Sequence, residues 1–158
     1  MRIYLFVLCL IGPVLSSCTD SSADPMAGVP FVNAPYEVVS QGTQQGITNQ
    51  QLHVVTNDAQ LAALAATATF NPAIPAIDFG ANRAVAIFTG LGTGCVDKLR
   101  IINVSEGADI FLVEVEKSVP GDGVVCPAFV PDYGPYLLAT IPKSGKPVSF
   151  AFTIKKVG

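Results

Sequence analysis

Apolar residues in the second half of the chain recur at every other position, and this pattern restricts the fold more than any other feature. In PVSFAFTIKK, residues 147–156, apolar side chains alternate with small, polar or charged ones. A strand with one face in a core and the other in water has this period of two. IFLVEVEK, residues 110–117, repeats the pattern and follows KLRIINV, residues 98–104, across a connection that contains Gly107. We expect these two runs to pair as an antiparallel hairpin.

Two other segments complete the expected architecture. RAVAIFTG, residues 83–90, is apolar on both faces, which predicts a central strand covered on both sides. TNDAQLAALAATA, residues 56–68, places leucine and alanine on one face and offers Thr56 or Asn57 as an N-cap, so it predicts a short helix. The sequence therefore predicts a mainly β (α+β) domain, either an antiparallel β-sandwich or a partly open barrel, with one short amphipathic helix.

The composition suits one domain with short extensions. The chain has 158 residues, half of them apolar, and a formal net charge of -3. Its lysines and arginines in the first three quarters of the chain are scattered singly, so no basic stripe is available to a phosphate backbone. Nucleic acid is therefore not expected as a partner.

The N-terminal segment predicts export and a lipid anchor. Residues 1–17 combine an early arginine, a short apolar run and small residues, which is the layout of a signal peptide. LSSC, residues 15–18, resembles a bacterial lipobox, in which cleavage exposes Cys18 for diacylglycerol attachment and acylation, for example with palmitate. An ordinary signal peptide that happens to end in a cysteine is the alternative. Thr19, in place of aspartate, favours the outer membrane if the source has one.

The remaining residues divide into a tether and a domain. Residues 18–34, rich in serine, alanine and proline, are expected to form the lipidated end and a flexible tether, and residues 35–158 the folded domain. Of the four cysteines, only Cys95 and Cys126 are left in the domain, so an oxidising compartment favours a disulfide between them. A redox or metal pair is the alternative, but the C-x-x-C spacing and a neighbouring histidine are both missing.

Three motifs resemble the C-terminal domain of the PrcB family, lipoproteins that accompany a subtilisin-like surface protease. The motifs are IDFGANRAVAIFTG, KLRIINV and GPYLLATIPKSGKPVSFAF, in residues 77–152, and the similarity spans residues 36–157. Gly94-Cys95-Val96 stands where the family commonly has Gly-Gly-Tyr, and the predicted helix lacks the family's tryptophans. The resemblance implies a lipoprotein whose partner is an exported protease.

Catalytic and metal-binding patterns are missing from the sequence. His53 is the one histidine, so any hydrolase triad would have to use it. It lies in an expected strand, where a lone histidine is more often a surface or packed residue than a catalytic base. Ser144 with Lys143 or Lys146 could form a Ser-Lys pair, but all three belong to a solvated turn. The loop aspartates lack the spacing of a calcium loop, and GLGTG lacks the rest of a phosphate-binding motif. We therefore expect a protein that is not an enzyme and carries no cofactor or metal.

The segment VPGDGVVCPAFVPDYGPY, residues 119–136, concentrates apolar and aromatic side chains between prolines and glycines. Such a loop is either the lid of a core or a contact surface. As a contact surface it would use Phe129, Tyr133 and Tyr136 as anchors for another protein. The sequence thus predicts a lipid-anchored, protein-binding domain of the bacterial cell envelope, an accessory or regulatory subunit of an exported protease. The alternative is a periplasmic module that binds a small ligand or cell-wall component between sheet and helix.

Overall fold

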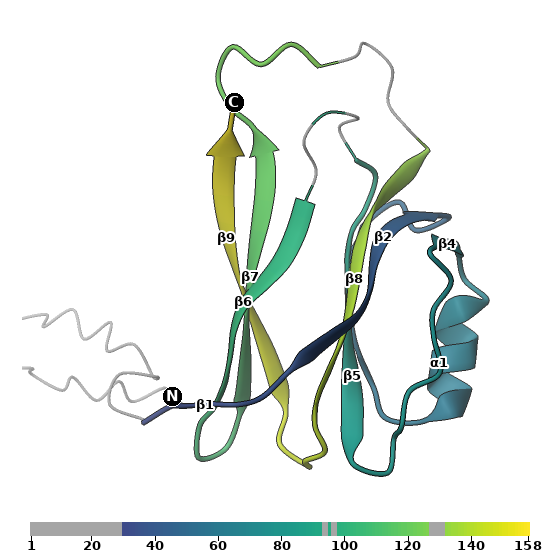
Figure 1. Ribbon diagram of the computed structural model, residues 1–158, viewed down its shortest axis with the longest axis vertical. Helices are drawn as coiled ribbons and strands as arrows, with labels where there is room; N and C mark the ends of the chain where they lie inside the picture. The colour runs from purple at the N-terminus through teal and green to yellow at the C-terminus, as the bar shows by residue number, and fades with distance from the viewer. Residues whose placement is uncertain (1–29, 93–94, 96–97, 127–131) are drawn as a thin grey trace, which may run out of the picture.

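The computed structural model describes residues 30–92, 95, 98–126 and 132–158 and shows two β-sheets packed face to face, with a helix outside one of them (Figure 1). The elements of this described part are, in chain order, β1 (Val32–Asn33), β2 (Glu37–Gln45), β3 (Gln50–Val55), α1 (Asp58–Ala65), β4 (Thr69–Asn71), β5 (Asn82–Thr89), β6 (Lys98–Glu106), β7 (Phe111–Pro120), β8 (Tyr133–Pro142) and β9 (Val148–Val157). The predicted mainly β fold with one short helix is confirmed.

The strand order bears on the two predicted architectures. One sheet has the order β1-β6-β7-β9 and the other has the order β3-β5-β8-β2-β4. All neighbouring strands are antiparallel except β7 and β9, which run parallel. Both sheets end in edge strands and no closed barrel forms among the described strands, so the structure agrees with the predicted β-sandwich.

The strands expected from period-two alternation are present. β6 and β7 form the predicted antiparallel hairpin, with an irregularity between Ile101 and Asn103 that leaves Ile102 outside the pairing and 43% exposed. In β9, Val148, Phe150 and Phe152 pack against the core, as the pattern predicts. Ile154 continues the same alternation but is 67% exposed, so the end of the alternating pattern lies beyond the covered part of the sheet.

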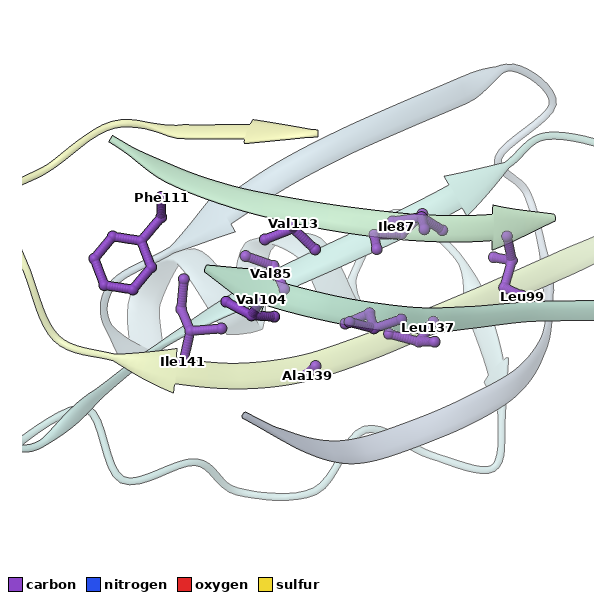
Figure 2. Packing of buried hydrophobic residues seen from close by; sticks show 11 residues of the cluster. Val85, Ile87, Leu99, Val104, Phe111, Val113, Leu137, Ala139 and Ile141 are labelled. Carbon is purple, nitrogen blue, oxygen red and sulfur yellow. The ribbon is translucent and has the colours of Figure 1, made fainter. Parts of the chain in front are cut away.

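Strand β5 lies between β3 and β8 and contributes to a core on each of its faces, as predicted. Val85 and Ile87 point between the two sheets, whereas Ala86 and Phe88 point toward α1. Figure 2 shows the side chains of the first core, which come from both sheets. They are Val85, Ile87, Leu99, Ile101, Val104, Phe111, Val113, Val115, Leu137, Ala139 and Ile141. The domain therefore has three layers: sheet, sheet and helix.

Helix α1 closes the second core. Asn57 is its N-cap and accepts a hydrogen bond from the backbone N–H of Gln60 at 2.9 Å, while the Gln60 side chain accepts one from the N–H of Thr56 at 2.8 Å. This reciprocal arrangement satisfies backbone donors that a helix start leaves unpaired. Leu61 and Leu64 are buried against the sheet, so the predicted helix is confirmed.

The folded part begins earlier than the sequence predicted. Val32 and Asn33 lie in the segment assigned to the tether, residues 18–34, but they form β1 and pair with Glu106 and Ser105 of β6. A two-residue strand has no periodicity of its own, and its pairing partner is far away in the sequence. The earlier start is therefore set by tertiary contacts.

Core burial predicts a large difference between two apolar strand residues of similar size. Leu137 is fully buried between the sheets, whereas Ile154 is 67% exposed. We expect Leu137→Ala to lower the free energy of unfolding by about 2 to 5 kcal/mol, because it leaves a cavity. The matched Ile154→Ala should cost about 0.5 kcal/mol or less. Urea unfolding measures both, and equal losses would contradict the described packing.

Candidate functional site

A disulfide braces one end of the sandwich. Cys95, in the connection between β5 and β6, is bonded to Cys126, in the connection between β7 and β8, with their Cα atoms 5.2 Å apart. The predicted bridge is therefore confirmed. Both connections cross from one sheet to the other, so the bond ties together two of the crossings between the sheets (Figure 1).

Backbone contacts hold the same end. The N–H of Gly92 donates to the carbonyl of Tyr133 at 2.9 Å, and the N–H of Gly121 donates to the carbonyl of Val157 at 2.8 Å. Gly134 lies so close to the backbone of Gly90 that a Cβ at position 134 would overlap the Gly90 carbonyl oxygen. Glycine is needed at position 134 for this close approach. Hydrogen bonds thus hold Gly92 against the start of β8 and Gly121 against the end of β9, and the disulfide joins Cys95 to Cys126.

Three apolar or aromatic side chains stand exposed at this end. Val125 directly precedes the bridged Cys126 and is 94% exposed. Tyr133 is 40% exposed and Leu91 is 38% exposed, and their segments meet at the Gly92–Tyr133 hydrogen bond. We call Leu91, Val125 and Tyr133, with the disulfide that braces them, the braced end. Exposed apolar groups on a fixed loop are the features of a contact surface.

The three predicted anchor residues have different outcomes. Tyr133 is 40% exposed at the start of β8, and its role as an anchor stays a prediction. Phe129 lies outside the described residues. Tyr136 is 1% exposed, so the prediction that it contacts a partner is wrong.

Tyr136 is a core residue because its strand position turns its ring toward α1. The ring meets Phe70 edge-on, with centroids 5.1 Å apart, and lies nearly parallel to Phe88. Its hydroxyl donates to the carbonyl of Pro72 at 2.5 Å and lies 2.7 Å from the hydroxyl oxygen of Ser40. A buried tyrosine needs such partners for its polar atom. The signal in the sequence was the continuous apolar run that follows Tyr136, which is typical of a strand buried on both faces.

A shallow apolar groove lies between the edge strand β3 and helix α1. Its volume is about 380 Å³, and its lining residues are His53, Val54, Val55, Gln60, Ala63, Leu64 and Thr67. Apart from His53, the lining carries no ionisable side chain. A second hollow of about 320 Å³ lies where the starts of β2 and β5 meet the end of β8. The first groove matches the place that the sequence analysis proposed for a small ligand, between sheet and helix.

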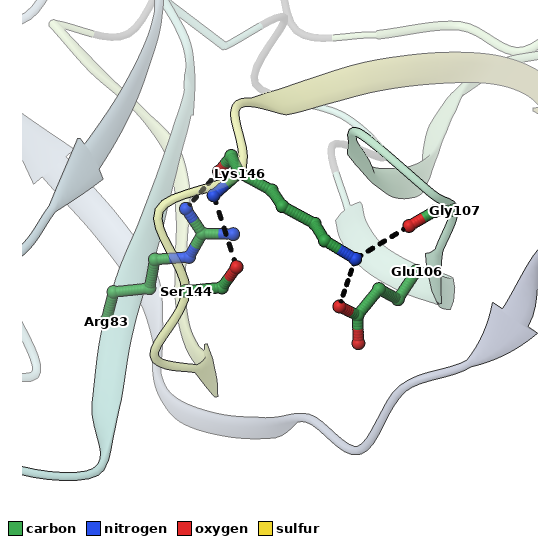
Figure 3. Close-up of polar contacts among 5 residues, drawn as sticks. All are labelled: Arg83, Glu106, Gly107, Ser144 and Lys146. Atoms are coloured by element: carbon green, nitrogen blue, oxygen red, sulfur yellow. Dashed lines mark hydrogen bonds and ion pairs between the residues drawn. The ribbon is translucent and has the colours of Figure 1, made fainter.

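A charged cluster closes the end of the sandwich opposite the disulfide (Figure 3). Arg83 is 4% exposed, lies over the ring of Phe111 at 4.8 Å and donates from Nη1 to the carbonyl of Lys146 at 2.5 Å. Burial lowers the pKa of Arg83, and the nearby carboxylate of Glu106 opposes this shift. The Nζ atom of Lys146 lies 2.6 Å from Glu106 Oε1 and donates to the carbonyl of Gly107 at 2.9 Å. These contacts join the start of β5 to the β6–β7 turn and the β8–β9 turn, so we assign the cluster a structural role.

The polar residues that raised catalytic alternatives have ordinary structural partners. The hydroxyl of Ser144 accepts a hydrogen bond from the backbone N–H of Lys146, whose side chain is paired with Glu106. His53 Nε2 lies 3.0 Å from the side-chain oxygen of Gln51. Among the described residues, no three His, Cys, Asp or Glu side chains are grouped as a metal site. In that same part of the chain, no helix has the length and apolar character of a membrane span.

The disulfide should contribute measurably to stability. It closes a loop across a sequence separation of 31 residues, and restricting the unfolded chain in this way contributes about 3 to 4 kcal/mol. We expect Cys95→Ala combined with Cys126→Ala to lower the free energy of unfolding by that amount. Urea unfolding of the oxidised protein and the double variant measures the difference. Identical midpoints would show that the bond does not constrain the chain as described.

The resemblance to the PrcB family rests on short sequence motifs alone. The PrcB resemblance therefore stays a prediction, and the function has to be argued from the chain's own residues. No protein-family profile, curated protein sequence or solved structure gives a significant match to this chain.

Proposed function

We propose that this protein is a lipid-anchored component of the bacterial cell envelope that binds another exported protein through its braced end. The observation that carries the proposal is the exposure of Val125, 94%, on a loop fixed by the adjacent disulfide. A fully solvated apolar side chain contributes nothing to the core. It can contribute to affinity when a partner removes it from water.

The disulfide beside Val125 favours binding over a purely structural role. A loop that is already fixed loses less conformational entropy when it binds, so more of the contact energy appears as affinity. Tyr133 adds a large side chain with only two rotatable bonds at the start of β8. The ion pair of Lys156 and Asp122, at 2.8 Å, supplies exposed polar groups near the same end. An apolar centre with polar surroundings is the usual anatomy of a protein interface.

The N-terminal segment and the family resemblance support the location and the first partner to test. Lipidation at Cys18 would hold the domain at a membrane surface, because Cys18 lies just before the folded part in the sequence. The PrcB resemblance names an exported protease as the partner. The proposed role is that of an accessory or regulatory subunit of that protease.

Removal of the exposed apolar groups should abolish partner binding without unfolding the domain. We expect Val125→Asp combined with Tyr133→Ala to lose co-purification with the partner when the full chain is recovered from detergent-solubilised native envelope. The melting temperature should change little, because Val125 is 94% and Tyr133 40% exposed. Mass spectrometry of the recovered material identifies the partner and measures its amount.

Val32→Ala is the matched control, because it removes another exposed apolar side chain, 68% exposed, from β1, which pairs with Glu106 at the opposite end of the sandwich. It should leave co-purification unchanged. Retention of the partner by the Val125 and Tyr133 double variant would contradict the assignment of the braced end. A large fall in its melting temperature would show that these side chains stabilise the folded domain and are not free for a partner.

A small ligand bound between β3 and α1 is the second candidate function, because the apolar groove of about 380 Å³ lies there. Ligand sites combine apolar walls with a few polar groups, and His53, Gln60 and Thr67 supply such groups here. The groove is open and contains no charged side chain. It suits an uncharged, partly apolar molecule better than a phosphate or carboxylate.

Blocking the groove tests this second candidate. Soluble oligomers of N-acetylglucosamine, which are uncharged fragments of cell-wall glycan, should raise the melting temperature of the wild-type chain by several degrees if they bind the folded state. Ala63→Trp should abolish the shift, because Ala63 lines the groove. Ala62→Trp places the same side chain at an exposed helix position that does not line it, so the shift should persist. Absence of a shift in the wild-type chain would exclude these fragments as ligands.

A further inference from the structure

The edge strands of the two sheets differ in how well they are protected from pairing. Exposed strand edges carry unpaired backbone N–H and C=O groups, which proteins usually guard with short strands, lysines or proline. Among the described strands, β1 has two residues and β4 has three, with Pro72 next in the chain. β9 is long but carries Lys155 and Lys156. β3, Gln50–Val55, has six residues and no charged side chain, so it is the edge without protection.

Strand β3 also carries apolar side chains that its own domain covers incompletely. Leu52 and Val54 are 38% and 37% exposed, two positions apart on one face of the strand. Their partners on β5 are Ile87 and Val85, which are fully buried between the sheets. The apolar layer therefore continues past the covered region onto β3. A further strand beside β3 would complete it.

We propose that β3 pairs with β3 of a second copy of this chain, antiparallel, about a two-fold axis at His53. In this register Leu52 of each copy lies opposite Val54 of the other, and Gln51 lies opposite Val55. Opposed residues share a face of an antiparallel pair, so each exposed leucine covers an exposed valine. The two five-stranded sheets then form one continuous sheet.

The charge pattern commits the proposal to a second copy. An interface between identical surfaces brings every charged group close to its own kind, so a charged edge opposes self-pairing. β3 contains no Asp, Glu, Lys or Arg, and its one histidine, His53, lies on the proposed axis. Gln60 and Ala63 of α1 and Thr67 after it, which line the groove beside β3, are also uncharged. Because the axis is perpendicular to the sheet, both helices lie on the same face. The β9 edge is less suited to self-pairing, since it would place Lys155 and Lys156 of both copies in the seam.

Cross-linking through a cysteine on the axis tests both the partner and the register. His53→Cys would place two cysteines directly opposite one another, with Cβ atoms about 4.5 to 5.5 Å apart, close to the separation that a disulfide needs. We expect mild oxidation of the purified full chain to give a covalent dimer on a non-reducing gel. The parent chain, with all its native cysteines, sets the background.

Gln50→Cys is the matched control on the same strand. In the proposed register its two copies lie about 20 Å apart, six residues along an extended strand, so they should not cross-link. Equal cross-linking of positions 50 and 53, or none above background at position 53, would overturn the proposal.

Sedimentation equilibrium of the full chain, in detergent of matched density, gives a second readout. The wild-type chain should approach twice its own mass as concentration rises. Leu52→Lys or Val54→Lys should weaken association at least about tenfold, because each brings two buried charges into the seam. Ile154→Lys, at an exposed site outside β3, should not. Thermal unfolding checks that each variant is folded, and a monomeric wild-type chain at every concentration would overturn the proposal.

Discussion

The burial of β5 on both faces is the constraint on which the rest of the structure depends. Its residues Ala84 to Phe88 are at most 1% exposed, so a layer of side chains must cover each face. The sheet that contains β6 and β7 covers one face, and α1 covers the other. Burial of this much apolar surface provides the dominant favourable term in folding. The three-layer arrangement follows from one strand that cannot be left exposed to water.

The two ends of the sandwich are closed by different interactions, and this difference separates structure from function. At one end the buried guanidinium of Arg83 lies on Phe111 and the turns are joined by Lys146 and Glu106. At the other end a disulfide joins the β5–β6 connection to the β7–β8 connection. Side chains there are free of the core's packing requirements. Val125 can therefore remain in water, where a partner can reach it.

Local patterns in the sequence predicted the elements that depend on local interactions. The alternation in β9, the β6–β7 hairpin and the Asn57 cap of α1 are all present. Such local patterns do not predict which distant segments pair. The parallel pairing of β7 with β9, for example, has no local signal in the sequence. Tyr136 was assigned to a surface loop because proline and glycine precede it, although its contacts with Phe70 and Phe88 come from distant strands. The disulfide could be predicted because only two cysteines remain in the domain.

Photo-cross-linking from position 125 in the native envelope tests the central claim most directly. A photoreactive amino acid in place of Val125, which is 94% exposed, would sit at the centre of the proposed contact without disturbing the core. The account predicts a specific adduct with one exported protein at this position and none from the same group at Val32, which is 68% exposed at the opposite end of the sandwich. Absence of any protein adduct at position 125, or the same adducts from both positions, would contradict binding through the braced end.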